Sequence, residues 1–179
     1  MSDAMAVVYL GLGANQGDPR DNLLRALASL QNVPEIDITA LSRFYRTKPV
    51  GGEPGQPDYI NAVAKIDCSL SPNDLLQSCL AIELSMGRIR AGRWGSRTID
   101  VDLLLYDSLS ISQPGLIIPH PLIRKRLFVL FPLSDVAPDT LELPPDGRRI
   151  GDVLDAANND PALADQKPIV VFDEPLVGI

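Results

Sequence analysis

The order in which strand-like and helix-like segments follow one another restricts this chain to few folds. Two segments have the apolar spacing of amphipathic helices, and each begins at a polar capping residue followed by proline. Four other segments have the apolar or alternating pattern of β-strands. In chain order, the expected elements are a strand at 6–13, a helix from Asp18 to about Gln31, strands at 36–46 and 59–67, a helix from Ser71 to about Met86 and a strand at 98–106. This β-α-β-β-α-β order predicts an α+β fold, a ferredoxin-like sandwich with an antiparallel sheet and helices packed on it.

The rest of the chain predicts only short elements. We expect a short helix or a mixed segment at 121–131, another short helix at 149–157, and from Pro168 onward either an edge strand or a loose end. At roughly 150 residues per domain, the 179 residues correspond to one domain with additions. We therefore expect one domain over residues 1–158 and a C-terminal extension over residues 159–179, packed on that domain or trailing from it.

Two glycine-rich segments separate these elements and are expected to be loops. Residues 49–57 contain three prolines and three glycines, a density that forbids regular structure. Residues 87–97 contain three glycines and four arginines and no acidic residue. Long loops in compact domains often carry function, but a tolerated insertion fits the same composition.

Charge is distributed unevenly along the chain. The formal net charge is −7, which argues against a generic nucleic-acid binder because such binding depends on lysine and arginine neutralising phosphates. Residues 86–126, however, contain seven basic and three acidic residues. A basic segment within an acidic protein predicts a small polyanionic ligand rather than a nucleic acid.

Cysteine and histidine content excludes other classes of protein. Two cysteines and one histidine argue against a disulfide framework and against a zinc site. No apolar run approaches the roughly 20 residues of a membrane span, and no charged segment precedes an apolar stretch at the start of the sequence. We therefore expect no membrane partner and a cytoplasmic location.

Two aspartates interrupt the apolar pattern of the strand at 98–106. Because side chains alternate along a strand, Asp100 and Asp102 share one face, with Cα atoms about 6.6 Å apart. Like charges on one face repel, and Mg²⁺ would offset that repulsion. A solvated outer face of an edge strand is the alternative. Arg93 and Arg97 precede the pair and could bind phosphate oxygens or pair with the aspartates themselves. Metal-binding carboxylates beside cationic donors are typical of phosphoryl transfer.

Two aromatic side chains lie in unusual sequence settings. Trp94, the only tryptophan, lies between glycine and arginine residues, where it could stack on a ligand ring or pack against the domain. His120 lies between Pro119 and Pro121, a setting that fits a structural histidine or a donor to a phosphate oxygen.

The stretch RWGSRTIDVDL at 93–103 resembles the signature of the 6-hydroxymethyl-7,8-dihydropterin pyrophosphokinase family. Other segments resemble the same family in the same order: YLGLGAN at 9–15, FYRTKPVG at 44–51, PDYINA at 57–62, IELSMGRIR at 82–90, PHP at 119–121 and RLFVL at 126–130. The resemblance covers about residues 6–155. Ala14 departs from the serine usual in the family, and Gly115 and Ile117 lack the polar groups that some members place near the nucleotide.

The resemblance implies an enzyme of folate biosynthesis. Its reaction transfers diphosphate from ATP to the hydroxymethyl group of the dihydropterin and releases AMP. By analogy with the family, Asp100 and Asp102 hold two Mg²⁺ ions, one between the α- and β-phosphates and one between the β- and γ-phosphates. Arg88 and Arg97 would neutralise the transferring phosphates. The expected partners are ATP and the pterin, bound by a monomer.

The resemblance also assigns binding residues to each substrate. The pterin is expected to contact Thr47, Pro49, Val50, Tyr59, Asn61, Trp94 and Phe128. ATP is expected to contact Glu83, Arg88, Arg90, Trp94, Arg97, Leu103, His120 and Arg126.

Two other functions fit the fold class alone. A ferredoxin-like ligand-binding module would have no need of the two aspartates together with four loop arginines. Another metal-dependent nucleotidyl transferase would share the aspartates but not the segments at 47–51 and 59–61. Release of AMP rather than ADP separates a pyrophosphokinase from an ordinary kinase.

Overall fold

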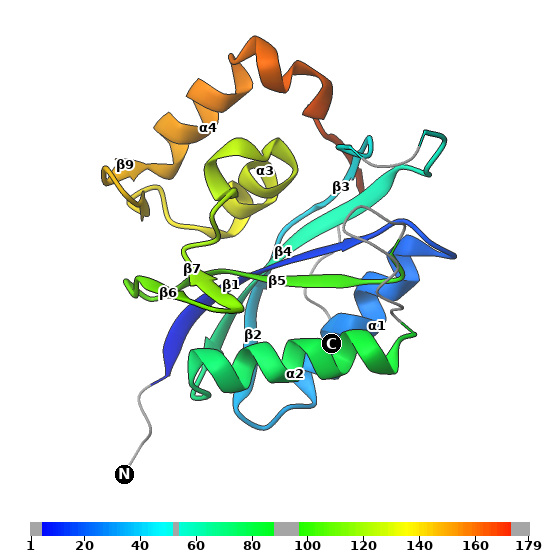
Figure 1. The fold of residues 1–179 in the computed structure, drawn as a ribbon, viewed down its shortest axis with the longest axis vertical. Helices are drawn as coiled ribbons and strands as arrows, with labels where there is room; N and C mark the ends of the chain where they lie inside the picture. The colour runs from blue at the N-terminus through cyan, green and yellow to red at the C-terminus, as the bar shows by residue number, and fades with distance from the viewer. Residues whose placement is uncertain (1–4, 52–53, 88–96, 173–179) are drawn as a thin grey trace.

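One antiparallel sheet with helices on both faces organises the chain (Figure 1). The computed structural model describes residues 5–51, 54–87 and 97–172. The first part contains β1 (Ala6–Ala14), α1 (Pro19–Gln31), β2 (Ile36–Leu41), β3 (Phe44–Thr47), β4 (Tyr59–Cys68), α2 (Pro72–Ser85) and β5 (Asp100–Tyr106). The second part contains β6 (Ile111–Gln113), β7 (Leu116–Ile118), α3 (Leu127–Val136), β8 (Glu142–Leu143), β9 (Arg148–Arg149), α4 (Ile150–Asn158) and β10 (Ile169–Phe172), with 3-10 turns at Ile123–Lys125 and Pro161–Gln166.

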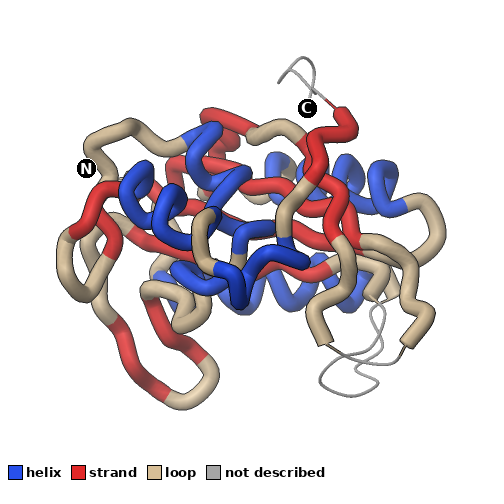
Figure 2. Tube along the Cα trace, turned by 90° about the horizontal axis from the view of Figure 1, so that it is seen from above, coloured by secondary structure: helices blue, strands red, loops and turns tan. Residues whose placement is uncertain are grey.

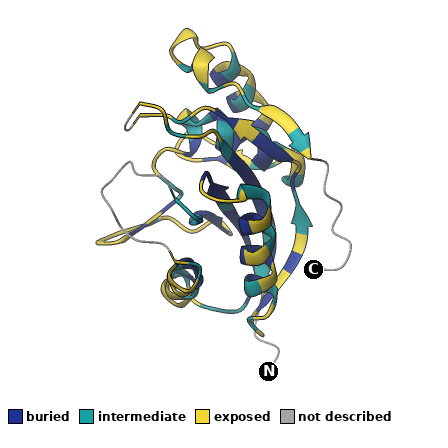
Figure 3. Ribbon diagram, turned by 90° about the vertical axis from the view of Figure 1, so that its right-hand side faces the viewer, coloured by how far each residue is buried: buried dark blue, intermediate teal, exposed yellow. Residues whose placement is uncertain are grey.

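The described strands of the main sheet follow the order β10-β3-β4-β1-β5, and β2 also pairs with β4. All of these pairings are antiparallel, as the sequence predicts. Helices α1 and α2 pack on one face of the sheet, and α3 and α4 lie over the other, as Figure 1 shows. Buried residues are concentrated in the sheet and on the inward sides of the helices (Figure 3). Two apolar cores result, one on each face of the sheet.

Both predicted helix starts are confirmed by their caps. The Asp18 carboxylate accepts a hydrogen bond from the Asp21 N–H at 3.0 Å, and the Ser71 hydroxyl accepts one from the Asp74 N–H at 3.2 Å. A side-chain acceptor at this position satisfies an N–H group that has no partner within the helix. Local sequence therefore fixes where these two helices begin.

The single strand expected at 36–46 is wrong, because the chain forms two strands there. At Ser42 a side chain takes the place of a backbone acceptor, because the Ser42 hydroxyl accepts a hydrogen bond from the Val63 N–H on β4 at 2.8 Å. The following residue, Arg43, turns its N–H to the Asp135 carboxylate at 3.1 Å. Strands β2 and β3 both pair with β4, but the interruption separates their registers. The hydrophobic pattern cannot reveal this break because the residues on either side remain strand-like.

The region after β5 also differs from its prediction. A hairpin of β6 and β7 fills 111–118, which no pattern indicated. Of the short helix or mixed segment expected at 121–131, the structure has the mixed segment: a 3-10 turn is followed by α3, which continues past the predicted end to Val136 with Pro132 inside it. Since α3 is mostly apolar and covers the sheet, tertiary packing stabilises it where its proline would disfavour a helix.

The C-terminal segment packs on the rest of the chain through both of its described elements. The 3-10 turn at Pro161–Gln166 packs against α3 and α4, and β10 pairs with β3 (Figure 2). The Phe172 ring contacts Phe44 edge-on, with centroids 6.4 Å apart, and the Arg20 guanidinium lies 5.2 Å from its centroid. Of the two outcomes expected for the tail, the structure therefore has the edge strand.

We expect Asp135→Ala to lower the free energy of unfolding by about 2 kcal/mol, because three groups on β3 and its approach would lose their acceptor. The carboxylate accepts hydrogen bonds from the Arg43 guanidinium at 2.7 and 3.1 Å and from the Tyr45 hydroxyl at 2.8 Å. Urea unfolding measures the change. Tyr45→Phe removes a single hydrogen bond and is the matched control, with an expected loss of about 1 kcal/mol. Equal losses in the two variants would contradict this role of Asp135.

Candidate active site

A cavity of about 660 Å³ lies over the sheet, between its strands and the chain segment that leads into α3. It is lined by residues from β1, β4, β5 and α2 and by residues within 47–51, 120–122 and 125–129. Its polar lining side chains are Thr47, Lys48, Gln56, Tyr59, Asn61, Glu83, Arg97, Asp100, Asp102, His120, Lys125, Arg126 and Gln166. Such a volume accommodates small organic molecules, and the lining is rich in charge.

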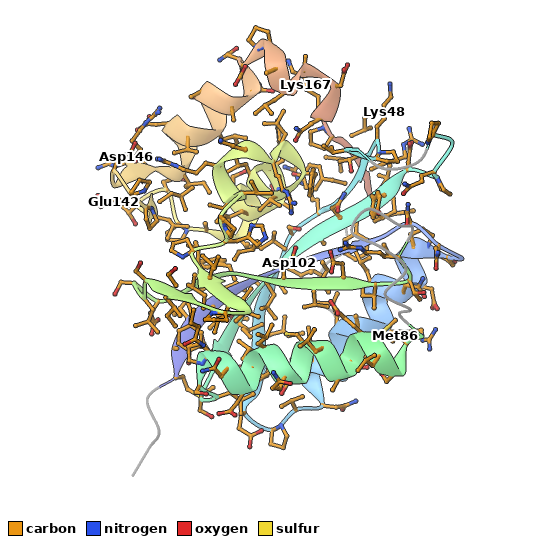
Figure 4. The ribbon with its side chains drawn as sticks, in the orientation of Figure 1. Lys48, Met86, Asp102, Glu142, Asp146 and Lys167 are labelled. Carbon is orange, nitrogen blue, oxygen red and sulfur yellow. The ribbon has the colours of Figure 1, made fainter. Side chains whose placement is uncertain are left out.

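Asp100 and Asp102 both line this cavity from β5 (Figure 4 labels Asp102). The Arg97 guanidinium donates a hydrogen bond to the Asp100 carboxylate. Partial burial raises the pKa of Asp102, and the negative charge of Asp100 adds to that effect. Arg126 and Arg97 oppose the rise. Although β5 is the edge strand, the aspartate face points into the cavity, so the alternative of a solvated outer face does not apply.

Glu83 on α2 holds the backbone between the two aspartates. Its side chain is buried, and its carboxylate accepts the Val101 N–H at 2.7 Å. Strand β5 lies at an edge of the described main sheet and pairs there only with β1. The N–H groups on its free edge therefore need acceptors outside the sheet. Glu83 supplies one of them and fixes the spacing between α2 and the aspartates.

The His120 side chain lies close to Asp102 in the cavity. The backbone N–H of His120 donates a hydrogen bond to the Leu104 carbonyl at 2.9 Å, which holds this residue beside β5. Its Nδ1 accepts the Leu122 N–H at 3.1 Å, so the neutral ring carries its proton on Nε2. That Nε2 lies 4.0 Å from an Asp102 oxygen. Burial, with a further contribution from Arg126, lowers the pKa of His120 to about 4, and Asp100 partly opposes this change.

On β4 and at the end of β3, three uncharged polar side chains line the cavity. The Asn61 side-chain amide donates to the Thr47 hydroxyl at 2.7 Å, which orients the carboxamide. Asn61 can occupy this place because residue 13 is glycine: a Cβ there would lie 2.8 Å from the Asn61 Oδ1. Tyr59 lines the cavity nearby, and its pKa is raised by burial. The Phe128 ring, with the Arg126 guanidinium 5.4 Å from its centroid, faces the same space.

Residues 9–138 match the family model of 7,8-dihydro-6-hydroxymethylpterin-pyrophosphokinase, or HPPK. This chain belongs to the HPPK family. The match spans well over half of the 179 residues and includes every described cavity side chain named above except Gln166. Family membership sets aside a ligand-binding module and a different nucleotidyl transferase. The enzyme therefore transfers diphosphate from ATP to 6-hydroxymethyl-7,8-dihydropterin in folate biosynthesis.

Named relatives agree with the family model. A 2-amino-4-hydroxy-6-hydroxymethyldihydropteridine pyrophosphokinase of Pseudomonas aeruginosa is 44% identical over 149 residues, which are 83% of this chain and 90% of the relative. The protein of the same name from Synechocystis is 46% identical over 141 residues, 79% of this chain and 71% of the relative. Among solved structures, the Plasmodium falciparum HPPK-DHPS with pteroate is similar in fold, with a TM-score of 0.67 at 13% identity. That similarity covers 87% of this chain and 43% of the longer Plasmodium chain.

The structure brings most of the predicted HPPK site residues to this one cavity. Those that line it are Thr47, Pro49, Val50, Tyr59, Asn61, Glu83, Arg97, Asp100, Asp102, His120, Arg126 and Phe128. Leu103, expected near the adenine, is instead buried in the apolar core, because strand alternation turns it away from the aspartate face. Arg88, Arg90 and Trp94 lie outside the described residues.

Sequence reasoning missed four polar residues of the cavity. Lys48 and Gln56 lie in or beside the expected proline- and glycine-rich loop, and Lys125 belongs to the basic run at 124–126, so local composition could have indicated them. No sequence signal indicated Gln166, which reaches the cavity only because the C-terminal segment folds back over α3. Its side-chain oxygen accepts the Leu127 N–H, at the start of α3, at 3.4 Å.

We expect His120 to titrate with a pKa of about 4 in the folded protein without substrates, because burial and Arg126 disfavour its charged form. It is the only histidine, so its ring resonances are directly assignable by NMR. The unfolded chain binds this proton near pH 6.5 and the folded chain does not. The contribution of His120 to stability is therefore complete above about pH 6.5 and falls as the pH drops toward 4. The control is the same titration in urea, and a folded-state midpoint above 6 would contradict the expectation.

Proposed function

We propose that the 660 Å³ cavity is the active site and that its two ends have different tasks. The charged end, with Asp100, Asp102, Arg97 and Arg126, would hold the phosphates of ATP. The neutral end, with Asn61 and its neighbours, would hold the pterin. The observation that supports this proposal is that both sets of side chains line one cavity and that Arg97 and Arg126 lie close enough to Asp102 to lower its pKa.

The donor set at the charged end fits magnesium. Mg²⁺ commonly takes one or two carboxylates from the protein and completes its coordination with water and substrate phosphates. Asp100 and Asp102 provide two carboxylates, and no group of three or more histidine, cysteine or acidic side chains suited to a metal occurs within the described residues. We infer that these two aspartates hold two ions, which when bound would neutralise phosphate charge and lower the pKa of the attacking hydroxyl.

The cationic side chains would act on the phosphates directly. Arg97 and Arg126 both lie close enough to Asp102 to lower its pKa, so both are near the place where the phosphates would bind. A guanidinium can make two parallel hydrogen bonds to a phosphate and stays charged throughout the reaction. Neutral His120 could donate to a phosphate oxygen from Nε2, because its Nδ1 is already an acceptor for the Leu122 N–H.

The neutral end would orient the pterin through hydrogen bonds and ring contacts. Asn61, with its carboxamide fixed by Thr47, offers a donor and an acceptor to the amide edge of the pterin ring. Tyr59 and Phe128 would contact the faces of the ring, and the backbone of Thr47 and Val50 would supply further polar groups. Holding the hydroxymethyl group beside the phosphates is the main contribution that this end can make to the rate.

We further propose an architecture and setting for the enzyme. The strand order around β5-β1-β4 and the helices between the strands support a ferredoxin-like domain at residues 1–158, with 159–179 as an extension. The enzyme is proposed to work as a monomer, and gel filtration of the purified protein tests this. The supply of ATP supports a cytoplasmic location. Within the described residues, no helix is both long and apolar enough to cross a membrane.

The proposal is tested by following product formation with ATP, 6-hydroxymethyl-7,8-dihydropterin and increasing Mg²⁺. We expect AMP and the pterin diphosphate in equal amounts, no ADP, and no product when a chelator removes the metal. If the rate reaches its maximum when one Mg²⁺ ion is bound per active site, the proposed second ion would be contradicted. Activity that survives the chelator would contradict the role of both aspartates as metal ligands.

A further inference from the structure

Asn15, at the turn between β1 and α1, connects two segments that border the cavity. The residue is only 2% exposed, and the roles proposed above leave it unassigned. It follows directly after β1 and contacts the chain just before β5 on one side and just before β4 on the other. Because the Asn15 carboxamide is hydrogen-bonded to both segments, it fixes how far apart they lie.

The first connection holds the backbone of Arg97 from both directions. The Arg97 N–H donates to the Asn15 side-chain Oδ1 at 2.8 Å, and the Asn15 N–H donates to the Arg97 carbonyl at 3.0 Å. The next pair repeats the contact, because the Thr98 hydroxyl donates to the Gln16 side-chain oxygen at 3.2 Å. These hydrogen bonds therefore fix the backbone of Arg97, which lies three residues before Asp100.

The second connection reaches the pterin side of the cavity. The Asn15 side-chain Nδ2 donates to the Pro57 carbonyl at 3.2 Å. Pro57 comes two residues before Tyr59, where β4 begins and the cavity lining resumes. One carboxamide thus uses its acceptor for the phosphate side and its donor for the pterin side.

We propose that Asn15 is a positioning residue that sets Arg97 against the pterin-binding residues. This inference rests on the proposed function, because it assumes that Arg97 acts on the phosphates. Asparagine suits the position because it presents one acceptor and one donor from the same planar group. Aspartate has the same shape but lacks the donor, and alanine lacks both.

Asn15→Ala and Asn15→Asp separate the two connections. For Asn15→Ala we expect kcat to fall about 10- to 100-fold, because small errors in the position of a catalytic group have effects of that size. For Asn15→Asp we expect kcat close to that of the wild type but a higher KM for the pterin, because the acceptor for Arg97 remains and the donor to Pro57 is lost. Hydrogen exchange at the Arg97 amide should be fast in Asn15→Ala and remain slow in Asn15→Asp.

A double-mutant cycle tests whether Asn15 acts through Arg97. In an Arg97→Ala background, Asn15→Ala should lower kcat less than about 3-fold, because the group that it positions is gone. Tyr106→Phe is the matched control: it removes a partly buried hydrogen bond of 2.6 Å to the Leu70 carbonyl at the far end of β5 and should leave kcat unchanged.

Two results would overturn the inference. One is a wild-type kcat in Asn15→Ala, and the other is the same loss of kcat with and without Arg97. If Asn15→Ala does not fold, fast exchange of the Arg97 amide in Asn15→Asp overturns it. Wild-type product analysis keeps the questions apart, because an inactive wild type contradicts the proposed function whereas an active wild type with indifferent Asn15 variants contradicts only this inference.

Discussion

Replacing Asp102 with asparagine is expected to lower kcat by about 10³-fold while the protein remains folded. The substitution keeps the shape of the side chain but removes the negative charge that would hold Mg²⁺ and, through it, the phosphates. Losing one group that stabilises charge in a transition state commonly lowers rates by 10²- to 10³-fold. The loss should appear together with a higher Mg²⁺ concentration for half-maximal rate.

The same substitution should not destabilise the protein. Burial and Asp100 raise the pKa of Asp102 in the folded state, so the folded protein binds this proton more tightly than the unfolded chain does. Because the folded state binds this proton more tightly, Asp102 stabilises the fold most at low pH. Its contribution to the free energy of unfolding is lost as the pH rises through the raised pKa. Asp102→Asn should therefore be at least as stable as the wild type at neutral pH in urea unfolding without metal.

Asp107→Asn is the matched control for this prediction. Asp107 follows the same strand, is exposed, and lies outside the cavity, where its carboxylate accepts the Val7 N–H at 2.8 Å. An amide oxygen can accept that same hydrogen bond, so kcat should stay within 2-fold of wild type by the usual small effect of such surface changes. Wild-type activity in Asp102→Asn would contradict the assignment of this aspartate to the metal.

Replacing Glu83 with alanine is expected to have the largest effect on stability, a loss of about 3 kcal/mol in the free energy of unfolding. The variant leaves the buried Val101 N–H without its acceptor and opens a space under β5. An unpartnered buried N–H alone costs about 1–3 kcal/mol, and the lost packing adds to this. Urea unfolding at neutral pH measures the change.

Glu83→Gln is the matched variant because glutamine keeps an oxygen that can accept the Val101 N–H. We expect it to lose less than about 1 kcal/mol. It also removes a negative charge that raises the pKa of Asp102, so that pKa should fall toward its ordinary value. Equal losses in Glu83→Ala and Glu83→Gln would show that the hydrogen bond to β5 is not what Glu83 contributes.

Sequence patterns predicted the parts of the fold that depend on neighbouring residues. The starts of α1 and α2 follow from Asp18 and Ser71, each followed by proline, since a cap acts within a few residues. The break between β2 and β3 was not predictable in this way. It depends on hydrogen bonds from Ser42 to β4 and from Arg43 to α3, which are distant in the chain.

The residues of the candidate site also fall into those predictable from local sequence and those that depend on distant contacts. Strand alternation alone places Asp100 and Asp102 on one face, and it also turns Leu103 away from them. Resemblance supplied Asn61, His120 and the other binding residues, but not their relation in space. Gln166 could not be predicted because its place depends on how the C-terminal segment packs over α3.

The sequence by itself determined the positions of α1 and α2 between strand segments, the acidic pair on β5 and the family to which the chain belongs. These features depend on residue type, periodicity and short motifs, which are local properties. Only the tertiary structure decided that the acidic pair faces a cavity, that Glu83 supports it from α2, and that Asn15 joins the two sides. Those relations join residues far apart in the chain, and they exist only when packing of the two apolar cores brings the segments together.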